Sequence, residues 1–119
     1  MGKAAKSIEF RAHIGLESSV PLKRFAMIIK GPGYVPTTDR AVVNSPDFAS
    51  TVLFVSSVEE AQGACQECVA NGVQLIELCG GFSEADRLAL SASIQHVIPI
   101  GVVGYSSDDD DRLHVLFGN

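Results

Sequence analysis

The chain has 119 residues, 46% of them hydrophobic, which fits one domain with a single core. Its net charge of −5 argues against nucleic acid as a partner, because nucleic-acid binding depends on basic patches. The sequence contains neither an apolar run near the ~20 residues that span a bilayer nor a signal peptide, so we expect a cytoplasmic protein without membrane contact.

Residues 1–22 form either an N-terminal extension or an edge strand, since apolar and polar side chains alternate over residues 8–14. Residues 23–119 are predicted to form a single α/β domain. Apolar segments rich in β-branched residues predict buried strands at 23–30, 51–56, 73–78 and 98–103. The loop between the first two carries a further extended piece at 40–43.

Two helices are predicted between these strands. The first spans 58–71, with Ser57 and Glu60 as a capping box and an apolar stripe at Val58, Ala61, Cys65, Cys68 and Val69. Ser83 caps the second, which ends near residue 95 or 96 and has its stripe at Ala85, Leu88, Ala89 and Ala92. The like-charge run at 108–111 is interpreted as an exposed loop, and residues 113–117 as a final edge strand.

Strands that alternate with helices are typical of a small, mostly parallel sheet with βαβαβ crossovers and two main helices. The strands carry apolar residues on both faces, so both faces must be covered. Helices on opposite sides would achieve this. Helices on the same side would leave the other face to residues 1–22 or to another subunit, and we therefore expect a homo-oligomer.

Ligands of parallel sheets bind beyond the carboxyl ends of the strands. Gly80-Gly81 lies at such an end, where free N–H groups would suit an anion or a carbonyl oxygen; the alternative is a simple turn. Tyr105 follows the last strand. Lys30 and Tyr34 join this edge if the first strand is also parallel.

Glu77, near the end of the strand at 73–78, is the candidate catalytic residue. A buried carboxylate needs partners, and burial raises its pKa towards values useful for a general acid or base. Two other interpretations remain open: a brace for the glycine loop, or exposure at the strand end. Arg40 is the expected counter-charge for Glu77 or for an acidic ligand, with a solvated surface pair as the alternative.

The chain contains three cysteines. Cys65 and Cys68 lie on the expected buried helix stripe and are interpreted as a core pair. Cys79, just before the glycines, is a candidate ligand-binding residue or nucleophile, with a small packing residue as the alternative. Zinc would need further ligands from scattered histidines, and the four aspartates lack the spacing of a calcium loop, so we expect no metal and no cofactor.

The run Gly72-Val73-Gln74-Leu75-Ile76-Glu77-Leu78-Cys79-Gly80-Gly81-Phe82 resembles a family of small bacterial α/β proteins of unknown function. The similarity extends over residues 23–105 and includes Gly31-Pro32-Gly33, Arg40 and residues 99–103. A histidine often precedes the arginine in that pattern, whereas Asp39 stands here. The resemblance implies an α/β fold and no particular activity.

Taken together, these patterns predict a pocket for a small anionic or carbonyl ligand, binding or enzymatic, built from Glu77, Arg40, Cys79, Gly80, Gly81 and Tyr105. The alternative is a non-catalytic assembly or protein-interaction module.

Overall fold

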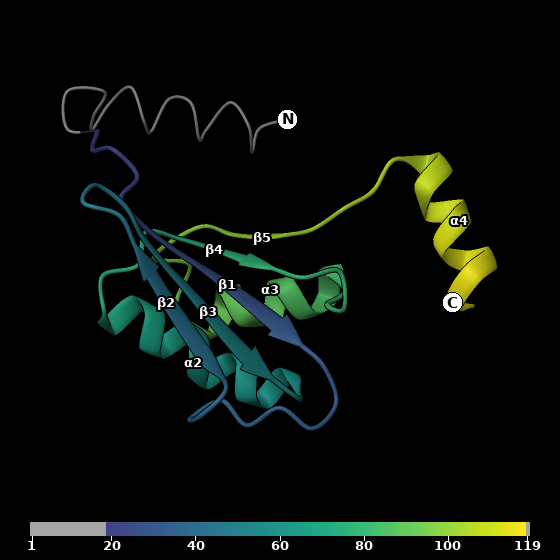
Figure 1. Ribbon diagram of the computed structural model, residues 1–119, viewed down its shortest axis with the longest axis horizontal. Coiled ribbons are helices and arrows are strands. Elements are labelled where there is room, and N and C mark those ends of the chain that lie inside the picture. Colours follow the sequence, from purple (N-terminus) through teal and green to yellow (C-terminus); the bar gives the residue numbers. More distant parts are fainter. Residues whose placement is uncertain (1–18, 119) are drawn as a thin grey trace.

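The computed structural model describes residues 19–118, which form a five-stranded sheet with three helices (Figure 1). The expected α/β fold is confirmed. The possible edge strand at 8–14 lies outside the described residues. The elements in chain order are β1 (Arg24–Lys30), β2 (Arg40–Asn44), β3 (Ala49–Val55), α2 (Val58–Ala70), β4 (Leu75–Leu78), α3 (Glu84–Ser93), β5 (Ile100–Val102) and α4 (Ser107–Phe117).

The strands lie in the order β2-β3-β1-β4-β5. β1 is parallel to both β3 and β4, and β5 is parallel to β4. β2, the extended piece predicted in the loop, runs antiparallel along the outer edge of β3. Because β1 is parallel to the other central strands, Lys30 ends at the same edge of the sheet as the glycine loop after β4.

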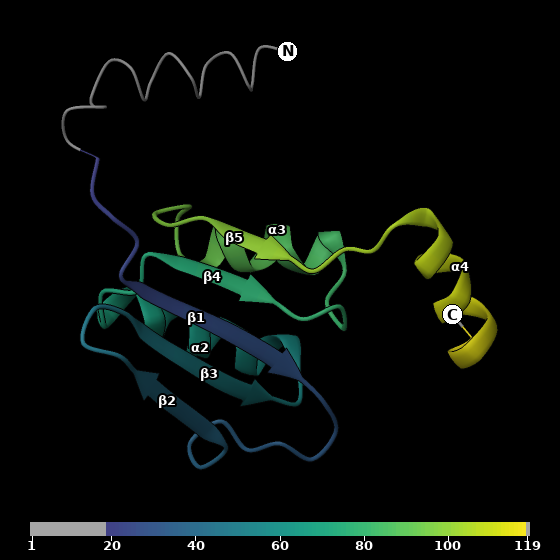
Figure 2. The same ribbon diagram turned by 45° about the horizontal axis from the view of Figure 1, so that its top comes forward.

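Both α2 and α3 pack on one face of the sheet, where they also contact each other (Figures 1 and 2). The buried core lies between them and this face. It comprises Ala26, Ile28, Leu53, Val55, Ala61, Ala64, Cys65, Cys68, Val73, Ile76, Leu78, Phe82, Leu90, Ile94 and Ile100. The cysteine pair of α2 is therefore a core pair, as expected.

The opposite face, which we call the open face, is not covered by any described helix (Figure 2). Because side chains alternate along a strand, it carries the residues next to those in the core. Its apolar side chains are half-buried and outside the core cluster: Phe25, Met27, Ile29, Val52, Phe54 and Leu75. Of the two arrangements expected for the helices, the structure has the one that leaves a face open.

The expected apolar stripe of α3 is wrong in phase, although its spacing is right. The predicted stripe faces outward, and Leu88 is 52% exposed. The buried side instead holds Leu90 and Ser91, followed by Ile94 at the C-cap. With α3 turned this way, the Arg87 guanidinium faces the backbone of β5 and donates a hydrogen bond to it. A prediction that considers only hydrophobic residues does not include this interaction.

The end of the chain is also corrected. Residues 107–117 form α4, in place of the expected loop at 108–111 and strand at 113–117. Ser106 caps this helix by accepting a hydrogen bond from the Asp109 N–H, and Asp108, Asp109 and Asp110 lie in its first turn. Acidic residues there stabilise the helix dipole, so the charge run starts a helix.

The capping box expected at α2 forms only in part. Ser57 Oγ accepts from the Glu60 N–H at 3.1 Å. The Glu60 carboxylate, however, accepts from the backbone N–H and the hydroxyl of Ser56, at 2.7 and 2.9 Å, so it secures the loop one residue earlier.

Candidate functional site

The carboxyl ends of β1 and β4 meet at the glycine loop. The Lys30 N–H donates to Cys79 Sγ at 3.3 Å. A Cβ built on Gly81 would lie 3.6 Å from the carbonyl oxygen of Lys30 and 3.9 Å from its Cε. The end of β1 and the start of the loop are therefore in direct contact, and Lys30 belongs to the site.

Tyr105 also lies against this loop. A Cβ built on Gly80 would lie 3.2 Å from the Tyr105 hydroxyl and 3.4 Å from its Cε2. The tyrosine ring thus occupies the space that a side chain at Gly80 would need. The fold brings together Cys79, Gly80, Gly81 and Tyr105, four of the six residues that sequence patterns assigned to the site.

The loop presents hydrogen-bond donors. Its turn is closed by the Phe82 N–H, which donates to the Cys79 carbonyl at 3.2 Å. No described residue accepts a hydrogen bond from the N–H of Gly80 or Gly81. These two N–H groups are the kind of donors that bind anionic and carbonyl oxygens.

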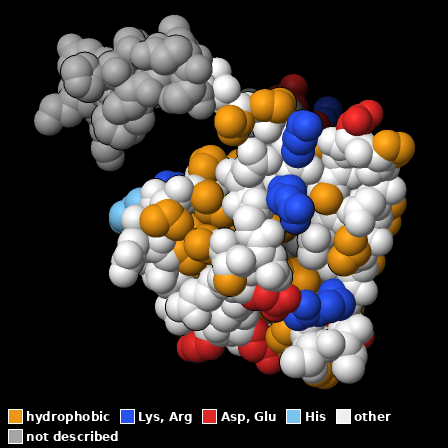
Figure 3. Space-filling view, turned by 90° about the vertical axis from the view of Figure 1, so that its left-hand side faces the viewer, with side chains coloured by type: hydrophobic (Ala, Val, Ile, Leu, Met, Phe, Trp, Pro, Cys, Tyr) orange, Lys and Arg blue, Asp and Glu red, His pale blue; other side chains and the backbone are white. Residues whose placement is uncertain are grey.

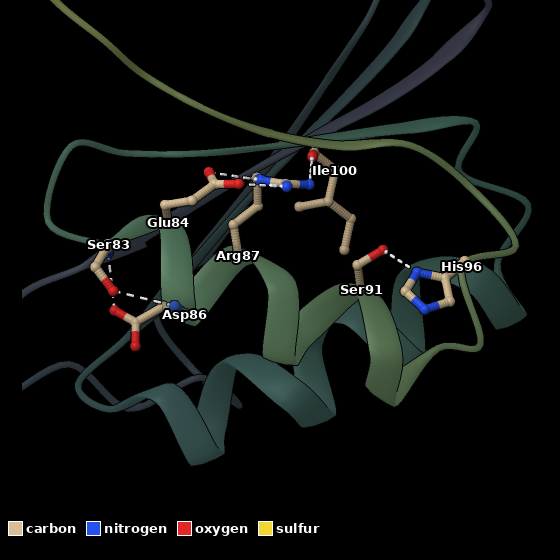
Figure 4. A network of polar contacts seen from close by, with 7 residues as sticks. All are labelled: Ser83, Glu84, Asp86, Arg87, Ser91, His96 and Ile100. Atoms are coloured by element: carbon tan, nitrogen blue, oxygen red, sulfur yellow. Dashed lines mark hydrogen bonds and ion pairs between the residues drawn. The ribbon is translucent and has the colours of Figure 1, made fainter. Parts of the chain in front are cut away.

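A complete capping box starts α3 directly after the loop (Figure 4). The Ser83 N–H donates to Asp86 Oδ2 at 2.9 Å, and Ser83 Oγ accepts from the Asp86 N–H at 3.0 Å. The backbone hydrogen bond from Ser83 is the main cause of the lowered pKa of Asp86, and the nearby charge of Lys30 also contributes. Lys30 and Asp86 therefore lie close enough to interact electrostatically.

Arg87 holds α3 against β5 (Figure 4). Its Nη1 donates to the Ile100 carbonyl at 3.2 Å, and its other nitrogens bind Glu84 at 2.9 and 2.5 Å. The Arg87 hydrogen bond lowers the pKa of Glu84. Arg87 thus holds α3, which follows the glycine loop, against the first residue of β5.

Glu77 lies on the open face and is exposed. Its neighbours across the sheet are Met27 on β1 and Gly101 on β5. It lines a hollow of about 150 Å³ with Gly101, Val102 and Val103, where the missing side chain of glycine leaves room. Its carboxylate forms no hydrogen bond or ion pair with any described residue, so it does not brace the glycine loop.

Arg40 lies elsewhere. It sits in β2, three positions from β4 in the strand order, and its side chain is on the face that the helices cover. There its Nη1 and Nη2 bind Glu67 at 2.5 and 3.1 Å, and it also donates to the Pro36 carbonyl. The Arg40 hydrogen bond lowers the pKa of Glu67. The expected pairing with Glu77 is not formed.

Cys65 and Cys68, the two cysteines of the CxxC segment in α2, are not reactive thiolates. Burial raises the pKa of Cys65 to about 12 and that of Cys68 to about 11, so both thiols are neutral at physiological pH. Residues 19–118 contain no group of three or more histidine, cysteine or acidic side chains arranged to hold a metal ion.

A second polar region, which sequence patterns did not single out, lies at the amino ends of the strands. Figure 3 looks onto this end and shows a column of basic side chains. Lys23 and Arg24 both line two shallow hollows there, of about 280 and 400 Å³. Gln74 ties β1 to the neighbouring strand, because its Oε1 accepts from the N–H groups of Lys23 and Arg24 at 2.7 and 2.9 Å. Only the strand order brings these residues together.

Residues 19–118 include no helix with both the length and the hydrophobicity to cross a bilayer. Comparisons with curated proteins and with solved structures found no match. A family model does match, over residues 23–118, and this range extends past the resemblance at 23–105 to include α4. The chain belongs to this family, which is described as a family of unknown function (DUF6506).

Proposed function

We propose that the carboxyl edge of the sheet binds a small ligand bearing an anionic or carbonyl oxygen. One observation carries the proposal: the free N–H groups of Gly80 and Gly81 lie where the side chains of Lys30 and Tyr105 meet the loop. Two backbone donors, an ammonium and a phenol hydroxyl would together stabilise negative charge on one oxygen or a small group of oxygens.

The charged side chains around the glycine loop limit which ligands can bind there. The Lys30 ammonium is 5.2 Å from the centre of the Phe82 ring, a cation–π distance that keeps it beside the loop. Asp86 and Glu84, in the first turn of α3, would repel a highly charged group such as a polyphosphate. A carboxylate or a polarised carbonyl fits this balance of charges best.

Glu77 is the proposed acid or base of any reaction at this site. The hollow beside it is also lined by Val103, which lies two residues before Tyr105 in the chain. A carboxylate that no described side chain engages is available to exchange a proton with a ligand in the hollow. In this arrangement the loop would bind the carbonyl oxygen, and Glu77 would act on a neighbouring atom of the ligand.

The test is a thermal-shift screen of carboxylic and carbonyl metabolites against the wild-type chain and the variants Lys30→Met and Tyr105→Phe. A ligand at 100 times its dissociation constant should stabilise the wild-type protein by about 2.7 kcal/mol. Lys30→Met should lose most of this gain, and Tyr105→Phe part of it.

The matched control is Arg24→Gln, which removes a cation from the opposite end of β1. A response lost in Arg24→Gln and kept in Lys30→Met would place the ligand at the amino ends of the strands and contradict the proposal. Glu77→Gln separates binding from catalysis: binding should persist in this variant, while turnover of a reactive ligand should fall.

A further inference from the structure

The open face carries apolar side chains on three neighbouring strands. Across β3, β1 and β4 its side chains are Val52, Met27 and Leu75 with their neighbours, all half-buried and none in the core. Tyr34 packs its ring 4.9 Å from that of Phe54 and so covers one end. No other described element lies over the face. Contiguous apolar patches of this kind mark interaction sites.

A second apolar surface lies on α4. Leu113, Leu116 and Phe117 follow the i, i+3, i+4 spacing and form one stripe along the helix. Leu116 is 70% exposed and Phe117 77%, and no residue of α4 is buried. Figures 1 and 2 both show α4 standing away from the sheet and the other helices. Yet α4 lies inside the range that matches the family, so it belongs to the domain.

The chain is held in place almost up to the start of α4. The Val103 N–H donates to the Leu78 carbonyl at 2.9 Å, and Tyr105 packs against Gly80. Ser106, the next residue, is already the N-cap of the helix. Only Ser106 separates the tyrosine from the helix, so α4 begins beside the glycine loop and points away from its own open face.

We propose that α4 of one copy packs across the open face of a second copy, and that the exchange is reciprocal and forms a twofold dimer. Each chain then supplies one apolar helix and receives one on its apolar sheet face, which satisfies both unpartnered surfaces. Self-complementary exchange of this kind closes at two subunits.

The α4 stripe and the open face match in length and have opposite charges at one end. An 11-residue helix is about 16 Å long, and the seven-residue β1 spans about 23 Å, so the helix fits along the face. The acidic first turn of α4 would lie near Lys23, the basic residue at the start of this face. If Asp109 lies near Lys23, then Leu116 lies near Met27. Lys23 and Met27 are about 13 Å apart along the strand, and Asp109 and Leu116 are about 10 Å apart along the helix.

The experiment measures the molar mass of the full chain in solution by light scattering over a range of protein concentrations. Wild-type protein should have twice the monomer mass. The helix variant Leu116→Asp and the face variant Met27→Asp should each weaken the dimer at least about tenfold, because each places a charge in an apolar contact. The matched control is Leu88→Asp on α3, which is similarly exposed but lies on neither surface and should stay dimeric.

The decisive experiment mixes the helix variant Leu116→Asp with the face variant Met27→Asp. The intact α4 of the face variant can dock on the intact face of the helix variant, so the mixture should recover a dimer weaker than wild type. If Met27→Asp fails to fold, Val43→Asp replaces it, at a 70% exposed position of the same face.

Three results would overturn the proposal. A monomeric wild-type protein would mean that no second copy covers the open face. A Leu116→Asp variant that stays fully dimeric would mean that two open faces pack directly on each other. Two variants that remain monomeric when mixed would show that α4 and the open face are not partners.

Discussion

At the scale of single residues, side-chain partners are decided by the face of the sheet as much as by charge. Arg40 and Glu77 are an obvious pair in the sequence, because few basic residues follow Lys30. In the fold they lie on opposite faces, and Arg40 binds Glu67 of α2 instead. Strand β2 sets this outcome, since the register that pairs Arg40 with Leu53 directs both side chains to the helix side.

The Arg40–Glu67 pair leads to a pH-dependent prediction. Its side chains are 32% and 39% exposed, so solvent screening limits the stabilisation at neutral pH to about 0.5 kcal/mol. The pKa of Glu67 is lowered in the folded state from its ordinary value of 4.5. The stabilisation is therefore present above the unfolded-state pKa and is lost as the pH falls through the folded-state pKa.

Urea unfolding at neutral and acidic pH checks this prediction. Glu67→Gln should be less stable than wild type at pH 7, and the difference should disappear in acid. The control is Asp111→Asn, an exposed acid in α4 that forms no ion pair with the described residues and should behave like wild type. An equal loss for Glu67→Gln at both pH values would contradict the ionic origin of the effect.

At the scale of secondary-structure elements, the ends of the helices carry more information than their hydrophobic stripes. Ser57, Ser83 and Ser106 each cap a helix, and the first two were identified from sequence. The observed stripe of α3 differs from the predicted one because three of the four predicted residues are alanines, whose burial gains little free energy, whereas burial of Leu90 and Ile94 gains more.

The C-terminal end of α3 leads to a second prediction. Gln95 and His96 have φ angles of 57° and 55°, in the left-handed region. This conformation costs most residues about 1–2 kcal/mol, whereas glycine adopts it freely. Gln95→Gly should therefore raise the free energy of unfolding by about 0.5–1 kcal/mol, after allowance for the entropy that glycine loses on folding.

Chemical denaturation measures the effect. The matched control is Ala92→Gly, in the helical part of α3, which should lower stability by about 1 kcal/mol. His96 is not substituted, because its Nδ1 is 2.9 Å from Ser91 Oγ and its side chain therefore contributes to the turn (Figure 4). A destabilised Gln95→Gly variant would show that the glutamine side chain matters more than its backbone angle.

At the scale of the whole molecule, the sheet has two different faces. The helix-covered face contains the described core, and the open face is apolar but holds Glu77 and a small hollow. The proposed ligand site lies at the carboxyl edge, next to the point where the chain leaves for α4. Tyr105 connects the two proposals, because it touches the glycine loop and lies two residues before the start of α4.

Dimer formation through α4 predicts that stability depends on protein concentration. Association with a second copy stabilises the folded state by mass action, so the thermal midpoint of the wild-type chain should rise with concentration. Leu116→Asp should show a midpoint that does not change with concentration, and Leu88→Asp should follow the wild type. Calorimetric scans at several concentrations check this, and a constant wild-type midpoint would contradict it.

Local sequence patterns are sufficient to predict the fold class, the four main strands, the two crossover helices and most of the residues at the carboxyl edge. These depend on local patterns: β-branched apolar runs, serine caps and a Gly-Gly turn. Tertiary structure alone decided the partner of Arg40, the phase of α3, the exposure of Glu77, and the placement of both helices on one face. Those features depend on strand order and on contacts between residues far apart in the chain, which periodicity within one segment does not encode.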